Sequence, residues 1–225
     1  MSVYFISGID TDVGKSLVTG VIARTLRDKG VNVITQKFIQ TGCTGISEDV
    51  LTHRRIMDIE PLDVDLYETT CPYVFTYPAS PHLAAEIDNR VIDVEVIHKA
   101  TEELESRFEM VLLEGAGGLL VPVTRNFLTI DYIRKYHYPL ILVSSSKLGS
   151  INHTLMSLEM CRLYKIDLRY VVYNEYPDES EEIKKDTITI IERYLYDYFP
   201  KCNLLRMPVI KDNRYPALFV DWRNQ

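Results

Sequence analysis

The sequence predicts an α/β fold in which a mostly parallel β-sheet carries helices on both faces. Two observations lead to this prediction. Short apolar runs alternate with helical patterns along the chain, as they do in strand–helix–strand units with right-handed crossovers. Each run is almost continuously apolar, which is typical of strands covered on both faces. Because the 225 residues contain no repeat, low-complexity stretch or linker, we expect a single domain over residues 1–225.

Five apolar runs are expected to form the strands of the sheet. They lie at residues 3–7, 31–36, 110–113, 140–143 and 170–173. Four helical patterns occupy residues 16–29, 92–108, 150–164 and 179–198. The first helix is expected to end at Gly30, because glycine accepts the left-handed conformation that often follows a helix. In the third helix, Leu155, Leu158 and Leu163 form the predicted inward stripe.

The stretch 8–16, GIDTDVGKS, lies between the first strand and the first helix. A glycine-bounded loop that ends in Lys-Ser in this position is typical of a phosphate-binding P-loop. Backbone N–H groups and the helix N-terminus would hold an anion there. Lys15 would reach the outer phosphates, and Ser16 would place its hydroxyl on Mg²⁺. A glycine turn before a helix is the simpler alternative, but it does not explain why Gly14, Lys15 and Ser16 all fall at the junction.

Polar residues follow the other predicted strands as well. Lys37 follows the second strand, Glu114 the third, a Ser-Ser-Ser-Lys stretch at 144–147 the fourth, and Asn174 the fifth. Open α/β sheets bind ligands at the carboxyl ends of their strands, so these side chains are expected to meet at one edge. Converging cations and a metal-binding carboxylate are what phosphoryl transfer requires, because negative charge spreads over the transferred group.

Three charged residues are candidates for the site, and each also has a simpler interpretation. Glu114 is predicted to hold Mg²⁺ near Ser16, although a solvated loop glutamate would look the same. A lysine directly after a buried strand indicates an anion, since burying an ammonium group is costly, but Lys37 could instead extend to solvent. Asp49 is a weaker metal candidate, because a helix-capping aspartate is equally compatible with its position.

The remaining composition narrows the class of protein. A formal net charge of −7 argues against a nucleic-acid partner, which would favour an excess of Lys and Arg. No signal peptide or membrane-spanning apolar stretch is visible, so no membrane partner is expected. The four cysteines are far apart, which favours reduced thiols in a cytoplasmic protein. The five histidines lack metal-ligand spacing, so structural or surface roles are their default interpretation.

One long segment interrupts the alternation of strands and helices. Residues 38–90 are rich in polar and turn-forming residues, and they separate the second strand from the third. Inserts of this length are usually functional in compact domains. We therefore expect short helices within the segment and a contribution to the ligand site.

Together these motifs resemble the dethiobiotin synthetase family, whose members have a P-loop NTPase-like α/β fold. The resemblance rests on the long P-loop, Lys37 with Thr41-Gly42, SPHLAA at 80–85, EGAGG at 114–118, KLGSINH at 147–153, and Asn174. It runs to about Pro208 and does not cover residues 209–225. In this family, CO2 adds to 7,8-diaminopelargonate to form a carbamate, ATP phosphorylates the carbamate, and the second amine closes the ureido ring.

The resemblance assigns expected roles to individual residues. Thr11, Lys15 and Lys37 would be catalytic, and Ser16, Asp49 and Glu114 would hold Mg²⁺. The residues expected to bind ATP are Asp12, Val13, Gly14, Lys15, Ser16, Leu17, Asp49, Glu114, Gly115, Ala116, Gly117, Asn174 and Pro208. The residues expected to bind the diamine substrate are Thr41, Gly118, Leu148, Gly149, Ser150, Ile151 and Asn152.

The start of the third predicted helix has a physical reason to bind a carboxylate. Ser150 is a good N-cap residue, and the free N–H groups beside it would attract the substrate carboxylate. An ordinary capped helix would have the same sequence. The resemblance implies a homodimer in which the neighbouring subunit supplies this helix start, so the site is expected to be shared across a two-fold axis.

Departures from the family pattern keep alternatives open. Phe38 stands where the family usually has proline, which is expected to alter the loop after Lys37. This leaves room for a paralogue with altered substrate or lost activity. A second alternative is a nucleotide-switch ATPase of the partitioning or septum-placing type, but the loop lacks the extra lysine that those proteins carry. A cobyrinate-type amidotransferase would need a glutaminase domain, for which 225 residues leave no room.

Overall fold

The computed structural model describes residues 3–221, and a six-stranded parallel sheet forms its central layer. The strands run in the order β10-β9-β8-β1-β5-β2. Their bounds are β1 Val3–Gly8, β2 Val33–Lys37, β5 Met110–Gly118, β8 Leu140–Ser145, β9 Leu168–Asn174 and β10 Asn203–Met207. The predicted parallel sheet is confirmed. The edge strand β10 was not predicted, because only Met207 of its five residues is buried and the run lacks a core-strand pattern.

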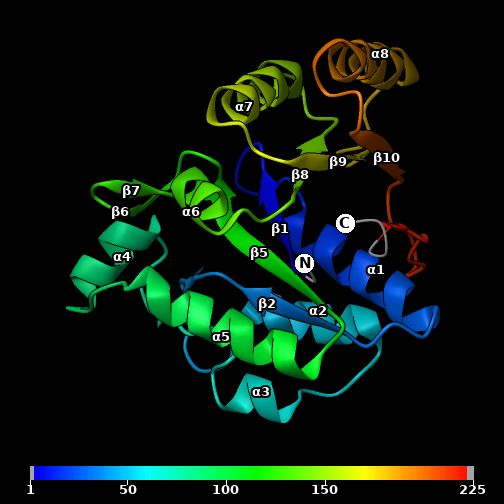
Figure 1. Cartoon of the computed structure of the whole chain (residues 1–225). Helices are drawn as coiled ribbons and strands as arrows, with labels where there is room; N and C mark the ends of the chain where they lie inside the picture. Colours follow the sequence, from blue (N-terminus) through cyan, green and yellow to red (C-terminus); the bar gives the residue numbers. More distant parts are fainter. Residues whose placement is uncertain (1–2, 222–225) are drawn as a thin grey trace.

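Helices cover both faces of this sheet, as expected (Figure 1). One face packs against α1 (Lys15–Asp28) and α2 (Glu48–Met57). The other face packs against α5 (Val94–Arg107), α6 (Thr129–Tyr136), α7 (Ser150–Tyr164) and α8 (Glu181–Tyr198). Successive side chains of β1 divide between the two cores, because neighbouring residues of a strand point to opposite faces. Among residues 3–221, no helix combines the length and the apolar character that crossing a membrane requires.

The four predicted helices form within two residues of their expected limits. Gly30 ends the first of them in the left-handed conformation, with φ of 82°, and its N–H donates to the Arg27 carbonyl. The predicted inward stripe of α7 is only partly right. Leu158 is fully buried, whereas Leu163 is 72% exposed. Leu163 lies about 140° around the helix from Leu158 and therefore faces away from the sheet.

The long segment between β2 and β5 contains the short helices expected of it. They are α2, α3 (Asp63–Leu66) and α4 (Pro81–Ile87). Its strands β3 (Gln40–Thr41) and β4 (Val74–Phe75) form a small parallel sheet, and β6 (Pro122–Thr124) pairs with β7 (Phe127–Leu128) later in the chain. Helix α2 packs closely on α1, since a Cβ atom on Gly20 would lie 2.7 Å from Ile56. This contact brings the start of α2 beside the P-loop.

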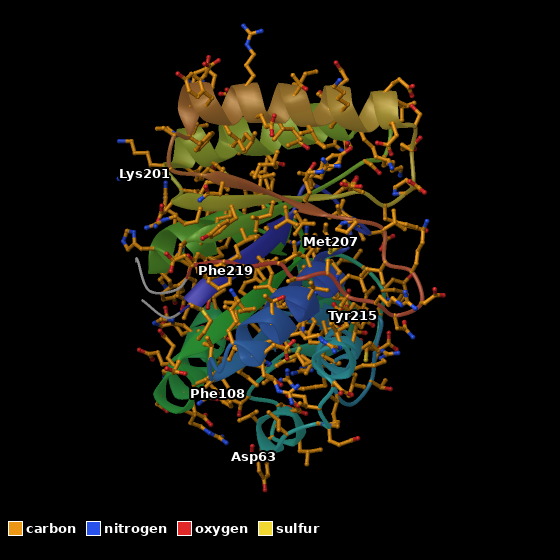
Figure 2. The ribbon with its side chains drawn as sticks, turned by 90° about the vertical axis from the view of Figure 1, so that its right-hand side faces the viewer. Asp63, Phe108, Lys201, Met207, Tyr215 and Phe219 are labelled. Atoms are coloured by element: carbon orange, nitrogen blue, oxygen red, sulfur yellow. The ribbon has the colours of Figure 1, made fainter. Side chains whose placement is uncertain are left out.

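The chain after β10 forms an extended cover over the α1 face of the sheet. Figure 2 shows residues from Met207 through Tyr215 and Phe219 running alongside α1. Leu218 and Val220 are buried in the core of that face, and the Leu218 N–H donates to the Thr25 hydroxyl at 3.0 Å. The sequence offered no role for this tail. Trp222 and the outer limits of the predicted domain lie outside the described residues.

Candidate active site

The P-loop connects β1 to α1, as the motif predicts. Gly14 has a φ of 90°, in the left-handed region where side chains are strained. A Cβ atom there would also lie 2.4 Å from Nδ2 of Asn174, so the position requires glycine. Asn174, at the end of β9, donates from Nδ2 to the Val13 carbonyl at 3.0 Å. Asn174 at the end of β9 thus holds the P-loop by a hydrogen bond to its backbone.

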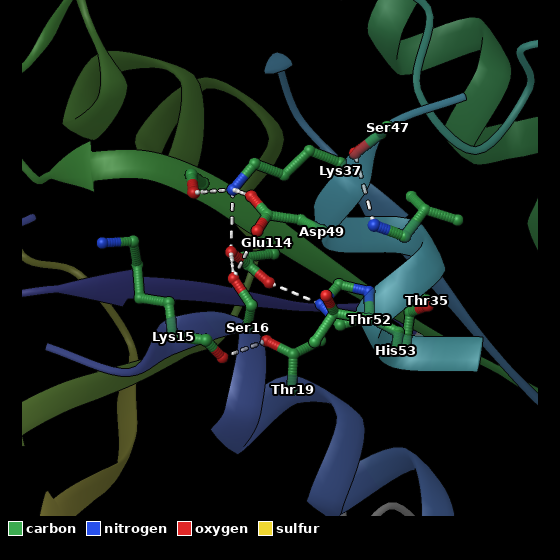
Figure 3. A network of polar contacts seen from close by, with 12 residues as sticks. Lys15, Ser16, Thr19, Thr35, Lys37, Ser47, Asp49, Thr52, His53 and Glu114 are labelled. Carbon is green, nitrogen blue, oxygen red and sulfur yellow. Dashed lines mark hydrogen bonds and ion pairs between the residues drawn. The ribbon is translucent and has the colours of Figure 1, made fainter. Parts of the chain in front are cut away.

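Four predicted residues meet in one polar cluster beside this loop (Figure 3). Lys37 Nζ lies 2.5 Å from Asp49 Oδ2 and 2.7 Å from Glu114 Oε1. The Ser16 Oγ lies 2.7 Å from Asp49 Oδ1 and 2.9 Å from Glu114 Oε1, and its single O–H is shared between these two acceptors. These residues come from β2, α2, β5 and α1, and sheet register already places Lys37 opposite Glu114. Lys37 is the last residue of its strand rather than the first residue after it.

The electrostatics of the cluster differ between its two lysines. Burial alone would raise the pKa of Glu114, but Lys37 and the hydrogen bond from His53 hold it well below its ordinary value. Burial opposes the charge on Lys37, yet Glu114 and Asp49 outweigh it and raise the Lys37 pKa. For Lys15, burial lowers the pKa to about 8, and Lys37 acts in the same direction. Lys15 therefore lies where a negatively charged ligand would stabilise its protonated form.

A cavity of about 390 Å³ opens over the P-loop and the cluster. The predicted residues that line it are Thr11, Asp12, Gly14, Lys15, Ser16, Leu17, Lys37, Thr41, Asp49, Glu114, Ala116 and Gly117. The three predicted catalytic residues thus share one cavity with most of the predicted nucleotide contacts. Its volume is in the range of small-molecule sites.

The oxygen atoms in this cavity could hold a divalent cation. The side chains of Ser16, Asp49 and Glu114 offer a hydroxyl and two carboxylates, which are the hard donors that Mg²⁺ prefers. Within residues 3–221, no group of three or more His, Cys, Asp or Glu side chains forms a complete metal site. This pattern fits Mg²⁺, which usually takes one or two carboxylates and completes its coordination with substrate phosphates and water.

A second cavity, of about 320 Å³, lies on the other side of the P-loop. Leu148, Gly149 and Ser150 line it together with Asp12 and Val13. The prediction that Ser150 caps α7 is wrong, because Gly149 occupies the N-cap with φ of 94° and Ser150 is the first helical residue. Glycine takes this left-handed position more readily than serine. The Ser150 N–H donates to the Lys147 carbonyl, so it is not a free donor.

Some predicted site residues lie apart from these two cavities. Gly118 lines a third cavity of about 390 Å³ together with Leu120 and Met156. Gly115 is buried, and its carbonyl accepts a hydrogen bond from Lys37 Nζ at 3.1 Å. The three remaining residues do not line the cavities described here; they are Ile151, Asn152 and Pro208.

The structure also explains Phe38. Its backbone N–H donates to the Glu114 carbonyl at 2.7 Å, a bond that proline could not make. Its ring is fully buried and packs on Tyr132 and Phe5, with centroid distances of 4.6 and 5.7 Å. Lys37 itself lies in register with Glu114.

One residue of the cluster was missed from the sequence. His53 is fully buried on α2, and its Nε2 lies 2.7 Å from Glu114 Oε2. The missing signal was the spacing from Asp49, since residues four apart lie on one face of a helix. That signal becomes useful only after α2 is known to pack beside β5.

Known proteins of one family match most of the chain. A family model described as an AAA domain matches residues 2–198. ATP-dependent dethiobiotin synthetase BioD 2 of Haemophilus ducreyi is 50% identical over 205 residues, covering 91% of this chain and 97% of that protein. The protein of that name from Haemophilus influenzae is 56% identical, covering 78% of this chain and 92% of its own length. ATP-dependent dethiobiotin synthetase BioD of Chlorobaculum tepidum is 51% identical, with 86% and 81% covered.

Solved structures with more distant sequences share the fold. A ParA family ATPase from Chlorobium tepidum TLS has a TM-score of 0.57 at 17% identity, with 94% of this chain and 86% of that chain covered. The MinC:MinD cell division complex of Aquifex aeolicus gives a TM-score of 0.54 at 16% identity, with 92% and 81% covered. At such identities the likeness concerns the fold alone. On the strength of the curated relatives, the chain belongs to the ATP-dependent dethiobiotin synthetase family.

Proposed function

We propose that the protein is an ATP- and Mg²⁺-dependent ligase that converts 7,8-diaminopelargonate and CO2 to dethiobiotin in biotin biosynthesis. The observation that carries the proposal is the cluster of Lys37, Asp49, Glu114 and Ser16 beside the P-loop. It combines a buried cation with two carboxylates that would bind Mg²⁺ at the place where the triphosphate would lie. Membership of the family supplies the substrate and the reaction.

The reaction divides into three steps. One amine of the substrate adds to CO2 and gives a carbamate. The carbamate oxygen then attacks the γ-phosphorus of ATP, forming a carbamic–phosphoric anhydride and releasing ADP. The second amine attacks the carbamate carbon, the ureido ring closes, phosphate leaves with the bonding electrons of the broken C–O bond, and the attacking nitrogen releases a proton to phosphate or solvent.

The protein groups act on the negative charge that these steps develop. In this proposal Lys15 binds the outer phosphates of ATP, and Lys37 lies beside the carbamate and the transferred phosphoryl group. Thr11 lines the same cavity and donates to the carbamate. Bound Mg²⁺, held by Ser16, Asp49 and Glu114, would neutralise phosphate charge. Preorganised cations of this kind stabilise the transition state more than the ground state.

The remaining nucleotide contacts extend this site. The phosphates lie on the loop residues from Asp12 to Leu17 and on residues 115–117 in the proposal. Asn174 contacts the adenine, and the chain at Pro208 closes over it. The family resemblance alone carries this adenine contact; in the structure Asn174 is buried, and its carboxamide bonds to the Val13 carbonyl and to the Tyr176 N–H.

We also propose a homodimer with a shared site for the diamine. Thr41 and Gly118 would contact the substrate from one subunit, and residues 148–152 of the neighbouring subunit would bind its carboxylate. Exposed apolar side chains support an interface here: Leu148, just before α7, is 80% exposed, and Met156, in the middle of α7, is 54% exposed. We place the enzyme in the cytoplasm, where its four unpaired cysteines would stay reduced.

A coupled assay tests this function. Purified protein should release phosphate from ATP and Mg²⁺ only when both the diamine and bicarbonate are present, and mass spectrometry should identify dethiobiotin. Rapid ATP turnover without the diamine would favour a nucleotide switch of the partitioning or septum-placing type. ATP turnover that depends on the diamine but yields a different product would indicate a paralogue with altered substrate.

A further inference from the structure

A buried histidine contacts the proposed metal-binding carboxylate from behind. Figure 3 shows the His53 ring on the α2 side of Glu114, opposite the place where Lys37 and Ser16 approach. Glu114 Oε1 accepts hydrogen bonds from Lys37 and Ser16, while Oε2 lies 2.7 Å from His53 Nε2. The two oxygens of one carboxylate thus have different partners, one set facing the cavity and the other facing the protein interior.

Burial gives the histidine contact its importance. The side chains of Glu114 and His53 are both 0% exposed, so the Oε2 atom has no access to bulk water. A buried carboxylate oxygen without a donor is strongly unfavourable. Because an ionised carboxylate only accepts hydrogen bonds, Nε2 of His53 must carry the proton in this contact. Among the described residues, Nδ1 of His53 has no hydrogen-bond partner, so the polar atoms of the ring make their one hydrogen bond with Glu114.

The same helix also supplies Asp49. Asp49 and His53 are four residues apart on α2, so they project from one face of the helix. Asp49 contacts the cavity side of the cluster, and His53 contacts the buried side of Glu114. The next residue, Arg54, ties α2 to α3 and β2 through Asp65 and Thr35. Any motion of α2 would therefore displace one proposed metal ligand and the support of another together.

We propose that His53 is a positioning residue that orients the Glu114 carboxylate so that Oε1 faces Ser16 and the Mg²⁺ position. This inference rests on the Mg²⁺–ATP site proposed above. His53 does not touch the nucleotide or the metal, and it acts through Glu114. Partners of metal ligands in this position typically contribute about 10–100-fold to metal affinity.

The test compares two substitutions of nearly equal size and shape, H53Q and H53M. Glutamine carries an N–H donor at about the position of Nε2, whereas methionine fills the same space without a donor. Mn²⁺ binding is measured by electron paramagnetic resonance at saturating non-hydrolysable ATP analogue, without diamine. H53M should weaken Mn²⁺ binding by about 10–100-fold, and H53Q should stay close to wild type. Affinity for the metal-free nucleotide should be unchanged in both variants.

Several results would overturn the inference. Wild-type Mn²⁺ affinity in folded H53M would show that Glu114 needs no support, and equal weakening in H53Q and H53M would point to packing alone. Thermal unfolding checks that the variants fold; if H53M does not, H53N replaces it, because asparagine is too short to reach Glu114. Failure of the proposed function is distinguishable, since wild-type protein would then bind no metal–nucleotide complex or would make a different product.

Discussion

Lys37 and Lys15 line one cavity but stand in opposite electrostatic situations. Lys37 is almost completely buried between two carboxylates that keep it protonated. Lys15 Nζ donates to the Asp10 carbonyl at 2.9 Å, and burial lowers its pKa to about 8. The first lysine belongs to a charge network that is complete without a ligand. The second is stabilised as a cation when an anion such as phosphate binds.

This difference predicts different outcomes for the two alanine substitutions. Lys37→Ala should abolish product formation while nucleotide still binds, because the P-loop is unchanged. It should also lower the free energy of unfolding by about 3–5 kcal/mol, since Glu114 loses its buried counter-charge.

Lys15→Ala should lower turnover by about 10²-fold or more, as the loss of a transition-state donor does.

Product formation, nucleotide binding and chemical denaturation of both variants provide the measurements. Ring closure by folded Lys37→Ala protein would show that Lys37 is structural. A near-normal rate for Lys15→Ala would remove its phosphate role.

At the scale of elements, α2 is held in place by a buried arginine and carries two residues of the cluster, Asp49 and His53. Arg54 donates from Nε and Nη2 to the two oxygens of Asp65 at 2.9 and 2.8 Å, and its Nη1 donates to the Thr35 hydroxyl at 2.7 Å. These buried bonds link α2 to α3 and β2. They fix the helix that carries Asp49 and His53.

The Asp65 carboxylate predicts an acid-sensitive contribution to stability. Burial would raise its pKa, but the hydrogen bonds and charge of Arg54 lower it below the ordinary value. The unfolded chain therefore binds a proton at higher pH than the folded protein does, so the free energy of unfolding should decrease as pH falls from about 4 toward the folded-state pKa.

Asp65→Asn tests this contribution. The variant should be less stable at neutral pH, because Arg54 is left without a counter-charge, and its stability should vary less with pH in the acid range. Urea denaturation between pH 3 and 7 provides the measurement, with Asp63→Asn as the control. Asp63 also pairs with an arginine, but its side chain is 59% exposed. An identical acid slope in wild type and Asp65→Asn would contradict the prediction.

The elements also show what the sequence could and could not predict. Lys37, Glu114 and Asn174 were visible because a polar residue after a buried apolar run is a local pattern, although β5 continues past Glu114 to Gly118 and only Lys37 and Asn174 end their strands. The pairing of His53 with Glu114 was not visible, because 61 residues separate them and the contact depends on how α2 packs. The cap of α7 was misjudged because serine and glycine both start helices, and only backbone geometry separates Gly149 from Ser150. The edge strand β10 could not be predicted because it is held by hydrogen bonds to β9 and has no apolar pattern of its own.

At the scale of the whole molecule, the two sheet faces are covered by different means. One face is covered by helices. The other face is covered by the helices α1 and α2 together with the extended tail. Within the tail, Leu218 is 3% exposed and Val220 is fully buried. The Asp221 N–H donates to the Tyr170 hydroxyl at 2.8 Å, which ties the tail to β9.

This arrangement predicts that the part of the tail around Leu218 and Val220 stabilises the fold without taking part in the chemistry. Leu218→Ala should lower the free energy of unfolding by about 2–5 kcal/mol, because it removes a buried side chain and leaves a cavity. Turnover at low temperature should be unchanged. Phe219→Ala is the matched control and should have a smaller effect on stability, since Phe219 is 40% exposed. Equal effects of the two substitutions would show that Leu218 is not part of the core.

The placement of the tail also has a consequence for biosynthesis. The central strand β1 and helix α1 are made well before the segment that seals them against β9, which follows about 200 residues later. A nascent chain that has reached Met207 already contains all six strands, yet part of its apolar sheet surface is still uncovered. While this surface is uncovered it can attract chaperones or other nascent chains, and the exposure ends when residues 218–221 pack over it.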